Sequence, residues 1–160
     1  VEIRGNIQTR LKKMEDEKID AIILAAAGLH RMGLKNKIKQ YLPLDEFIPS
    51  AGQGILCIEY LESNHEIERI LTKHMIKDVQ TCAEIERNFI KTLDGDCMSP
   101  IGVHTRYNKD KIEVCAYVSD IDGKNNIRTK YENTSNENVN AGEKLADIFI
   151  QQGARKLLNK

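Results

Sequence analysis

The sequence has no excess of charge of either sign, because its 24 lysines and arginines balance 24 aspartates and glutamates. A general attraction to nucleic acid or to an anionic membrane surface is therefore not expected. It also has no apolar run near the roughly 20 residues that span a bilayer, the longest being residues 21–29. We expect no nucleic-acid partner and no membrane partner, and any anion-binding site must be local.

Cysteines and histidines at metal-binding spacing are missing as well. No C-x-x-C pair occurs among Cys57, Cys82, Cys97 and Cys115, and no H-x-x-x-H pair among His30, His65, His74 and His104. This spacing disfavours zinc-ribbon and thioredoxin-type sites, and we expect no metal site. Without a secretory signal, the thiols are expected to be reduced and the protein cytoplasmic. Because residues 1–3 resemble the end of a strand and no initiator methionine precedes them, the sequence is expected to begin within a longer protein.

The first stretch alternates extended and helical patterns. Residues 1–3 and 19–25 are predicted to be strands, and Ile7–Asp16 a helix, which is typical of an α/β fold with a parallel or mixed sheet. Asn6 is a plausible N-cap, so Arg4 and Arg10 would flank the positive end of this helix, a good position for a carboxylate or phosphate.

Two later segments carry turn signals. After Gly28 the chain is predicted to turn away from the sheet edge, where Arg31 is either a ligand-binding residue or a solvated surface arginine. Gly52 and Gly54 flank Gln53 and indicate positive φ or a close backbone approach. Because the spacing does not match a P-loop, a tight inter-domain crossing is the better interpretation, followed by a strand at residues 55–60.

From about residue 78 the pattern changes to that of a small α+β domain. A helix with one apolar face ends at Asp94-Gly95, strands are predicted at residues 102–107, 112–119 and 126–132, and a final helix follows the asparagine-rich residues 133–140. A helix, three antiparallel strands and a helix would form a compact unit of about 80 residues.

Two residues of this unit stand out chemically. Glu86 falls on the apolar face of the first helix, so it either bridges specific partners or forms a partly exposed pair with Arg87 at the edge of that face. Cys97 lies in the turn after the helix, where Pro100 forces an extended exit. A cysteine there can be a small buried side chain or can carry a covalent group, and activation of its thiol would need cations from elsewhere in the fold.

These segments, in this order, resemble the porphobilinogen deaminase family, the hydroxymethylbilane synthases of tetrapyrrole and heme biosynthesis. The resemblance covers the C-terminal half of a full-length member and lies in Arg4-Gly5-Asn6 with Thr9-Arg10, residues 20–29 with Arg31 and Gly33, Pro49 with residues 51–54, Glu86-Arg87, and Gly95 with Cys97 and residues 100–102.

The resemblance implies a transferase that condenses four porphobilinogen molecules, with loss of ammonia, into hydroxymethylbilane. It implies that Cys97 holds a dipyrromethane cofactor through a thioether, and that Arg4, Arg10 and Arg31 bind the carboxylates of the pyrroles. The family's catalytic aspartate would lie upstream of Val1, so this segment alone should not catalyse. Its partner would be the N-terminal half of the same protein, which would be a monomer when full length.

The resemblance also implies three domains. Residues 1–46 would be the second half of domain two, residues 47–75 a return segment completing domain one, and residues 76–160 the cofactor-bearing domain three. The alternative hypothesis is a non-enzymatic anion-binding α/β module, in which the three arginines grip a carboxylate ligand and Cys97 is inert. A thiol-redox role ranks third, because no resolving cysteine lies near Cys97 in the sequence.

Overall fold

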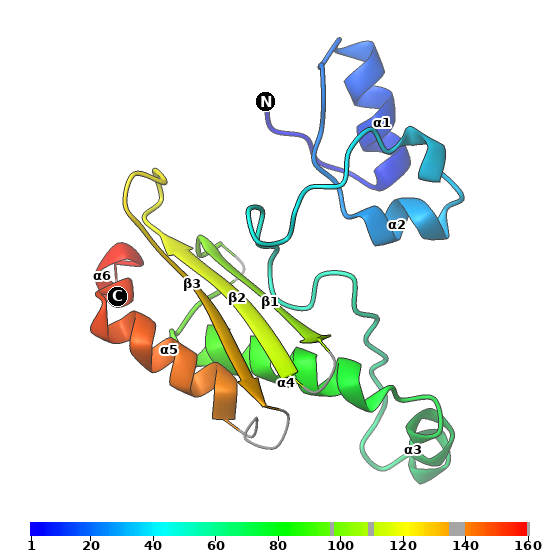
Figure 1. The fold of residues 1–160 in the computed structure, drawn as a ribbon. Coiled ribbons are helices and arrows are strands. Elements are labelled where there is room, and N and C mark those ends of the chain that lie inside the picture. Colours follow the sequence, from blue (N-terminus) through cyan, green and yellow to red (C-terminus); the bar gives the residue numbers. More distant parts are fainter. Residues whose placement is uncertain (97, 109–110, 135–139, 160) are drawn as a thin grey trace. The chain divides into compact units, whose positions relative to one another are not determined.

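A computed structural model describes residues 1–96, 98–108, 111–134 and 140–159 (Figure 1). The chain divides into two compact units, Val1–Leu42 and Pro43–Lys160. The domain boundaries predicted after residues 46 and 75 stay predictions. None of the helices among the described residues is both long enough and apolar enough to cross a membrane.

The first unit is built from helix α1 (Ile7–Asp16), helix α2 (Ala26–Arg31) and a 3-10 turn, η1 (Lys35–Lys37). Helix α1 has its predicted bounds, and the predicted cap is confirmed because the Asn6 carboxamide oxygen accepts the Thr9 N–H at 2.8 Å. The turn predicted directly after Gly28 is wrong, since Gly28 lies within α2. A Cβ at Gly28 would lie 2.6 Å from the Ile7 Cδ1, so glycine allows the two helices to approach closely.

The strands predicted at residues 1–3, 19–25 and 55–60 do not form in the described structure. A strand needs a hydrogen-bonded neighbour, and the sheet of the described residues contains only three strands, all of them beyond residue 100. The apolar composition of these segments predicted strands, but composition does not show whether a partner strand is present, and Ile23, Leu56 and Ile58 are exposed.

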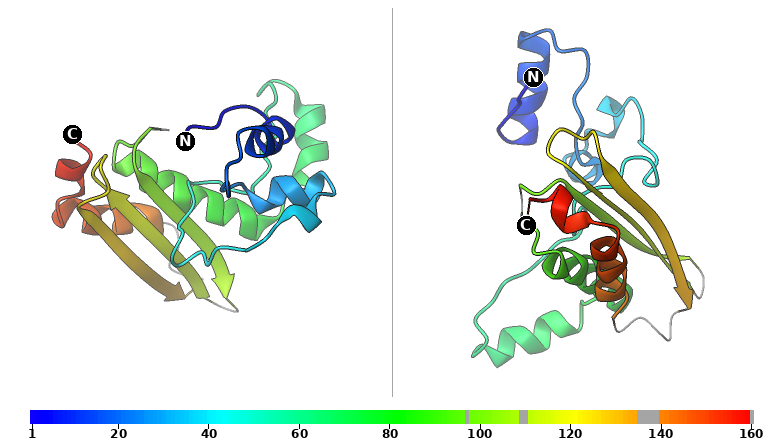
Figure 2. Two further views of the ribbon diagram at one scale, coloured as in Figure 1. Left: turned by 90° about the horizontal axis from the view of Figure 1, so that it is seen from above. Right: turned by 90° about the vertical axis from the view of Figure 1, so that its left-hand side faces the viewer.

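The second unit contains the small α+β fold that the sequence predicts. Strands β1 (Ile101–Asn108), β2 (Lys111–Ser119) and β3 (Asn126–Thr134) form an antiparallel sheet in the order β1-β2-β3. Helices α4 (Lys77–Thr92) and α5 (Ala141–Gln151) lie on one face of this sheet (Figure 2). Helix α3 (His65–Thr72) precedes them and helix α6 (Ala154–Leu157) follows.

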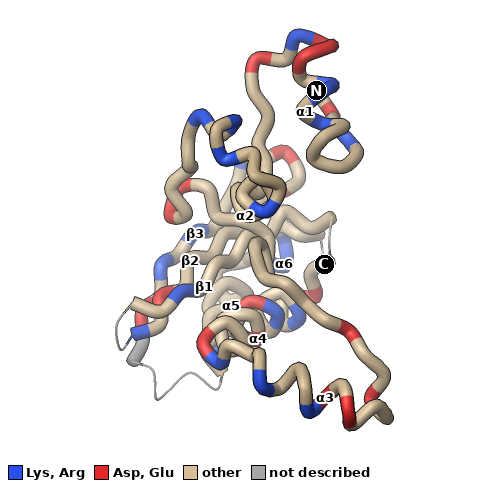
Figure 3. Tube along the Cα trace, turned by 90° about the vertical axis from the view of Figure 1, so that its right-hand side faces the viewer, with Lys and Arg blue, Asp and Glu red and all other residues tan. Residues whose placement is uncertain are grey.

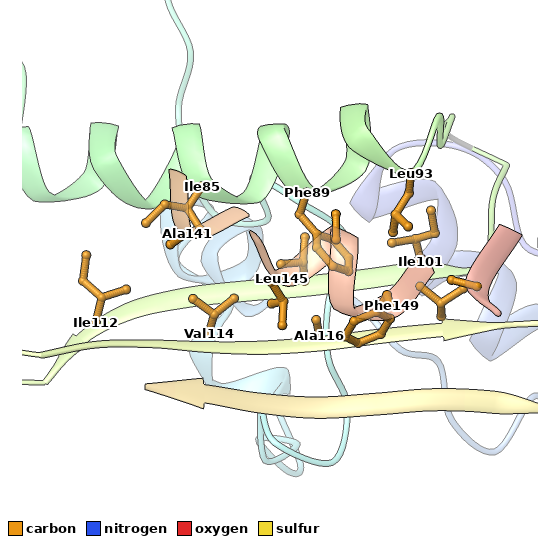
Figure 4. Close-up of a cluster of buried hydrophobic side chains, with 14 residues drawn as sticks. Ile85, Phe89, Leu93, Ile101, Ile112, Val114, Ala116, Ala141, Leu145 and Phe149 are labelled. Atoms are coloured by element: carbon orange, nitrogen blue, oxygen red, sulfur yellow. The ribbon is translucent and has the colours of Figure 1, made fainter. Parts of the chain in front are cut away.

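The core lies between that face of the sheet and the two helices (Figure 4). Alternate residues of β2 point inward and are fully buried: Ile112, Val114, Ala116 and Val118. They meet Phe89 of α4 and Phe149 of α5, whose rings pack edge to face with centroids 5.2 Å apart. Each such large side chain contributes about 1.5–3 kcal/mol by leaving water, so this layer stabilises the platform from which the 94–100 loop extends.

Helix α4 ends where the sequence predicts. Thr92 is its last residue, Asp94 has φ +57°, and the Gly95 N–H donates to the Ile90 carbonyl at 2.9 Å. This return bond is a helix-terminating arrangement that uses a left-handed residue. The stop directs the chain into the loop that contains Cys97.

Candidate functional site

The N-terminus of α1 lines a pocket of about 460 Å³ in the first unit. Its walls come from residues 5–8 and from Arg10, Leu24, Ala25 and Met32. The Arg10 Nε donates to the Gly5 carbonyl at 2.7 Å, which fixes the guanidinium beside the first turn. A helix N-terminus with an anchored guanidinium offers N–H donors and positive charge to an anion.

The other two predicted arginines, Arg4 and Arg31, do not line this pocket. Arg4 is exposed and pairs with Glu2 at 2.5 Å, while Arg31 lies in the last turn of α2 and has no hydrogen bond or ion pair with any described residue. Of the three, Arg10 alone lines the pocket, and Arg31 immediately precedes Met32 in its wall. The structure therefore places one predicted arginine in the pocket and does not bring all three together.

The charge of the first unit favours an anionic ligand. Residues 1–42 carry nine lysines and arginines against five aspartates and glutamates, although the whole chain is neutral. Figure 3 shows basic positions on α1, on α2 and on the segment after α2. The local excess of positive charge agrees with the expectation that an anion site must be local.

Cys97 lies outside the described residues, but the loop around it has a defined hydrogen-bond pattern. One Asp96 carboxylate oxygen accepts the Met98 N–H and the Ser99 hydroxyl, each at 2.9 Å, and the Ser99 hydroxyl oxygen accepts the Asp96 N–H at 3.0 Å. The Asp96 carboxylate therefore builds the turn itself, which is the physical reason for an aspartate next to the cysteine.

Glu86 bridges two segments, as one of the two sequence interpretations predicts. Its side chain is 2 % exposed, and its two carboxylate oxygens accept the Gly52 N–H at 2.7 Å and the Thr105 N–H at 2.6 Å. The alternative, a partly exposed pair with Arg87, is wrong. Burial raises the pKa of Glu86, and the two backbone hydrogen bonds oppose that rise.

His104 is a second titratable group close to this carboxylate, with its Nδ1 3.8 Å from a Glu86 oxygen. Burial, and to a lesser degree Arg106, lowers the pKa of His104. No sequence pattern pairs His104 with Glu86, because the two lie on different elements. The charged residue on an apolar helix face is a pattern visible in the sequence. It identified Glu86, but it did not identify the groups that Glu86 contacts.

The two buried cysteines, Cys82 and Cys115, are not activated thiols. Burial raises the pKa of Cys82 to about 11, with Glu86 and Asp78 adding to the rise, and burial also raises the pKa of Cys115. Cys57 is exposed. Over the described part of the chain, no cluster of three or more histidines, cysteines, aspartates or glutamates could hold a metal ion.

Two family models match this chain. Residues 1–69 match "Porphobilinogen deaminase, dipyromethane cofactor binding domain", and residues 80–151 match "Porphobilinogen deaminase, C-terminal domain". The chain belongs to the porphobilinogen deaminase family. Arg4, Arg10 and Arg31 lie within the residues matched by the cofactor-binding model, and Cys97 lies within those matched by the C-terminal model.

Curated porphobilinogen deaminases match the chain from end to end. The protein of Campylobacter hominis is 43 % identical over an alignment of 162 positions, which covers 100 % of this chain and 52 % of the relative. The protein of Coxiella burnetii (strain Dugway) is 38 % identical and that of Desulforamulus reducens 35 %, each over 99 % of this chain. The chain spans about half the length of the porphobilinogen deaminases it matches.

Proposed function

We propose that the chain is the C-terminal half of a hydroxymethylbilane synthase, a transferase that joins four porphobilinogen molecules with loss of ammonia. The observation that carries the proposal is the anchored Arg10 at the N-terminus of α1, in a pocket within the residues matched by the cofactor-binding family model. Acetate and propionate groups on every pyrrole ring require such donors, and a guanidinium can bind a carboxylate through two parallel hydrogen bonds.

The residues fit a covalently held dipyrromethane. Cys97 would hold it by a thioether in a loop closed by Asp96 and Ser99, and Arg4, Arg10 and Arg31 would bind its carboxylates. When bound, the cofactor supplies the free pyrrole α-carbon to which substrate units are added. The chain's own residues hold and orient: Asn6 fixes the helix start, and Arg10 presents its guanidinium next to the first turn.

The catalytic aspartate would be supplied by the N-terminal half, which we propose as the partner of this chain. The apolar segment after Gly54 supports such a partner, because Leu56, Ile58 and Leu61 are 65–76 % exposed. An apolar strand-like segment without a neighbour is suited to adding to the sheet of another polypeptide.

A cytoplasmic location and a monomeric full-length protein stay predictions of the sequence.

Intact mass spectrometry of the chain, co-expressed with its N-terminal half in cells that make porphobilinogen, tests the proposal. We expect a dipyrromethane adduct on the 160-residue chain, lost in Cys97→Ala and retained in Cys57→Ala, because Cys57 is the exposed thiol outside the loop. An unmodified chain, or a Cys97→Ala variant that forms hydroxymethylbilane at the normal rate, would overturn it. A reversible carboxylate ligand without any adduct would favour the anion-binding module instead.

A further inference from the structure

The Glu86 carboxylate is a buried charge that the proposed chemistry does not use. The groups around it come from three parts of the second unit: Gly52 before α3, Thr105 and His104 on β1, and Cys82 one turn earlier on its own helix. Within the described residues no lysine or arginine nitrogen lies within ion-pair distance of it. Two backbone N–H groups are thus its hydrogen-bond donors, one on each oxygen.

Residues 45–52, which we call the connecting segment, are attached to the sheet at further points. The Arg128 guanidinium donates to the Glu46 carbonyl at 2.8 Å, and the Val103 N–H donates to the Pro49 carbonyl at 2.9 Å. A Cβ on Gly102 would lie 2.7 Å from the Ile48 carbonyl oxygen. The segment therefore lies directly on β1, and this close approach is the physical reason for glycine at position 102.

Glu86 differs from the other attachments because it belongs to α4. Its side chain joins α4 to the connecting segment and to the edge of β1 at once, since one oxygen serves each of them. Six residues after Glu86, α4 ends and the chain enters the 94–100 loop. A displacement of the connecting segment is therefore transmitted through the Glu86 carboxylate to the helix that carries this loop.

We propose that Glu86 is a positioning residue, a clamp that fixes the connecting segment to α4 and β1. When the connecting segment detaches from α4 and β1, the protein opens locally without unfolding as a whole. The clamp itself is independent of catalysis, whereas its value in orienting the Cys97 loop rests on the proposed function. A carboxylate is required, because both partners are donors. Glutamine keeps the shape but presents an NH₂ group to one of the two N–H groups.

Amide hydrogen exchange of the 160-residue chain by NMR tests the clamp. In Glu86→Gln the Gly52 and Thr105 amides are both expected to exchange at least tenfold faster than in the parent. The exchange rate of the central Val114 amide should change only by the amount that follows from any change in the global free energy of unfolding. Glu84→Gln is the matched control, because Glu84 is an exposed glutamate on the same helix whose partner is the side chain of Gln80. It should leave all three amides unchanged.

Gly102→Ala provides a second test that leaves the carboxylate intact and applies if Glu86→Gln does not fold. The added methyl group displaces Ile48, so the amides of Val103 and Gly52 should both lose protection if the connecting segment opens as one unit. Equal acceleration of every amide in Glu86→Gln, or loss of protection at Val103 with Gly52 unaffected in Gly102→Ala, would overturn the proposal. An enzyme without a cofactor on Cys97 would overturn the proposed function and leave the clamp standing.

Discussion

Some buried polar atoms in this chain have hydrogen-bond partners, whereas one buried hydroxyl has none among the described residues. The Glu86 carboxylate has a backbone donor on each oxygen, and the Glu113 carboxylate is held by Arg106 at 2.7 Å and by the Asn108 carboxamide. These hydrogen bonds lower the pKa of Glu113, whereas burial raises that of Glu86. The difference follows from the surroundings: the hydrogen bonds from Asn108 and then Arg106 outweigh burial at Glu113, whereas burial outweighs the two backbone hydrogen bonds at Glu86.

Thr105 is the opposite case, because its hydroxyl oxygen is buried without a hydrogen-bond partner among the described residues. Thr105→Val replaces the hydroxyl with a methyl group of similar size and keeps the backbone N–H that Glu86 accepts. We expect the free energy of unfolding to rise by about 1 kcal/mol, since an unsatisfied buried polar group costs about 1–3 kcal/mol. Urea denaturation measures it. Thr105→Ser, which keeps the hydroxyl and loses the methyl group, should instead destabilise the protein; a destabilised valine variant would contradict the prediction.

Cys82 gives a pH dependence with a definite sign. Its pKa is raised from 9.0 to about 11, so the folded state keeps a proton that the unfolded state loses. The stabilisation from this thiol is complete below pH 9 and is lost as the pH rises towards 11. Urea denaturation at pH 8 and pH 10.5 should therefore show a smaller loss of stability in Cys82→Ala than in the parent. An equal loss in both proteins would show that Cys82 does not titrate as the burial implies.

At the scale of elements, the contact between α4 and α5 depends on one glycine. A Cβ on Gly142 would lie 2.1 Å from the Ile85 carbonyl oxygen, which is a backbone atom and cannot rotate away as a side chain can. Gly142→Ala must therefore separate the helices that cover the sheet and is expected to lower the free energy of unfolding by at least about 1–3 kcal/mol. Thermal and urea denaturation measure the change. Glu143→Ala, at the exposed neighbouring position, should cost much less; equal stability of the two variants would contradict this close packing.

The elements that the sequence predicts well are those whose partners are close in the chain. Helix α1 has its own cap in Asn6, and β1, β2 and β3 pair with sequential neighbours, so local patterns were sufficient. The segments at residues 19–25 and 55–60 have the same apolar character but no neighbour in the described sheet, and composition cannot distinguish these situations. Likewise the helical pattern singled out Glu86, but Gly52 and Thr105 are distant in sequence and only the fold brings them to it.

At the scale of the whole molecule, the two compact units differ in net charge. Residues 1–42 carry a net charge of +4, so the remainder carries −4. The predicted arginines all belong to the basic unit, and the predicted attachment residue Cys97 belongs to the acidic one. The chain as a whole is neutral, so the excess of positive charge is a property of the first unit alone.

The apolar segment at residues 55–61 includes Leu56, Ile58 and Leu61, which are exposed. Ile58 is 65 % exposed, so Ile58→Asp should change the free energy of unfolding of the isolated 160-residue chain by less than about 0.5 kcal/mol. If this segment pairs with the N-terminal half, the same substitution places a charge in the joined sheet and should abolish co-purification of the two halves.

Ile121 supplies the matched control, because it is an isoleucine with 77 % exposure in the hairpin turn between β2 and β3. Ile121→Asp should leave both the stability and the co-purification unchanged. Hydrogen exchange adds a residue-level measurement: the amides of residues 55–60 should be unprotected in the chain alone and protected in the complex. Normal assembly of Ile58→Asp would contradict the pairing, and the exposed isoleucine would then be an ordinary surface side chain, as single exposed apolar residues commonly are.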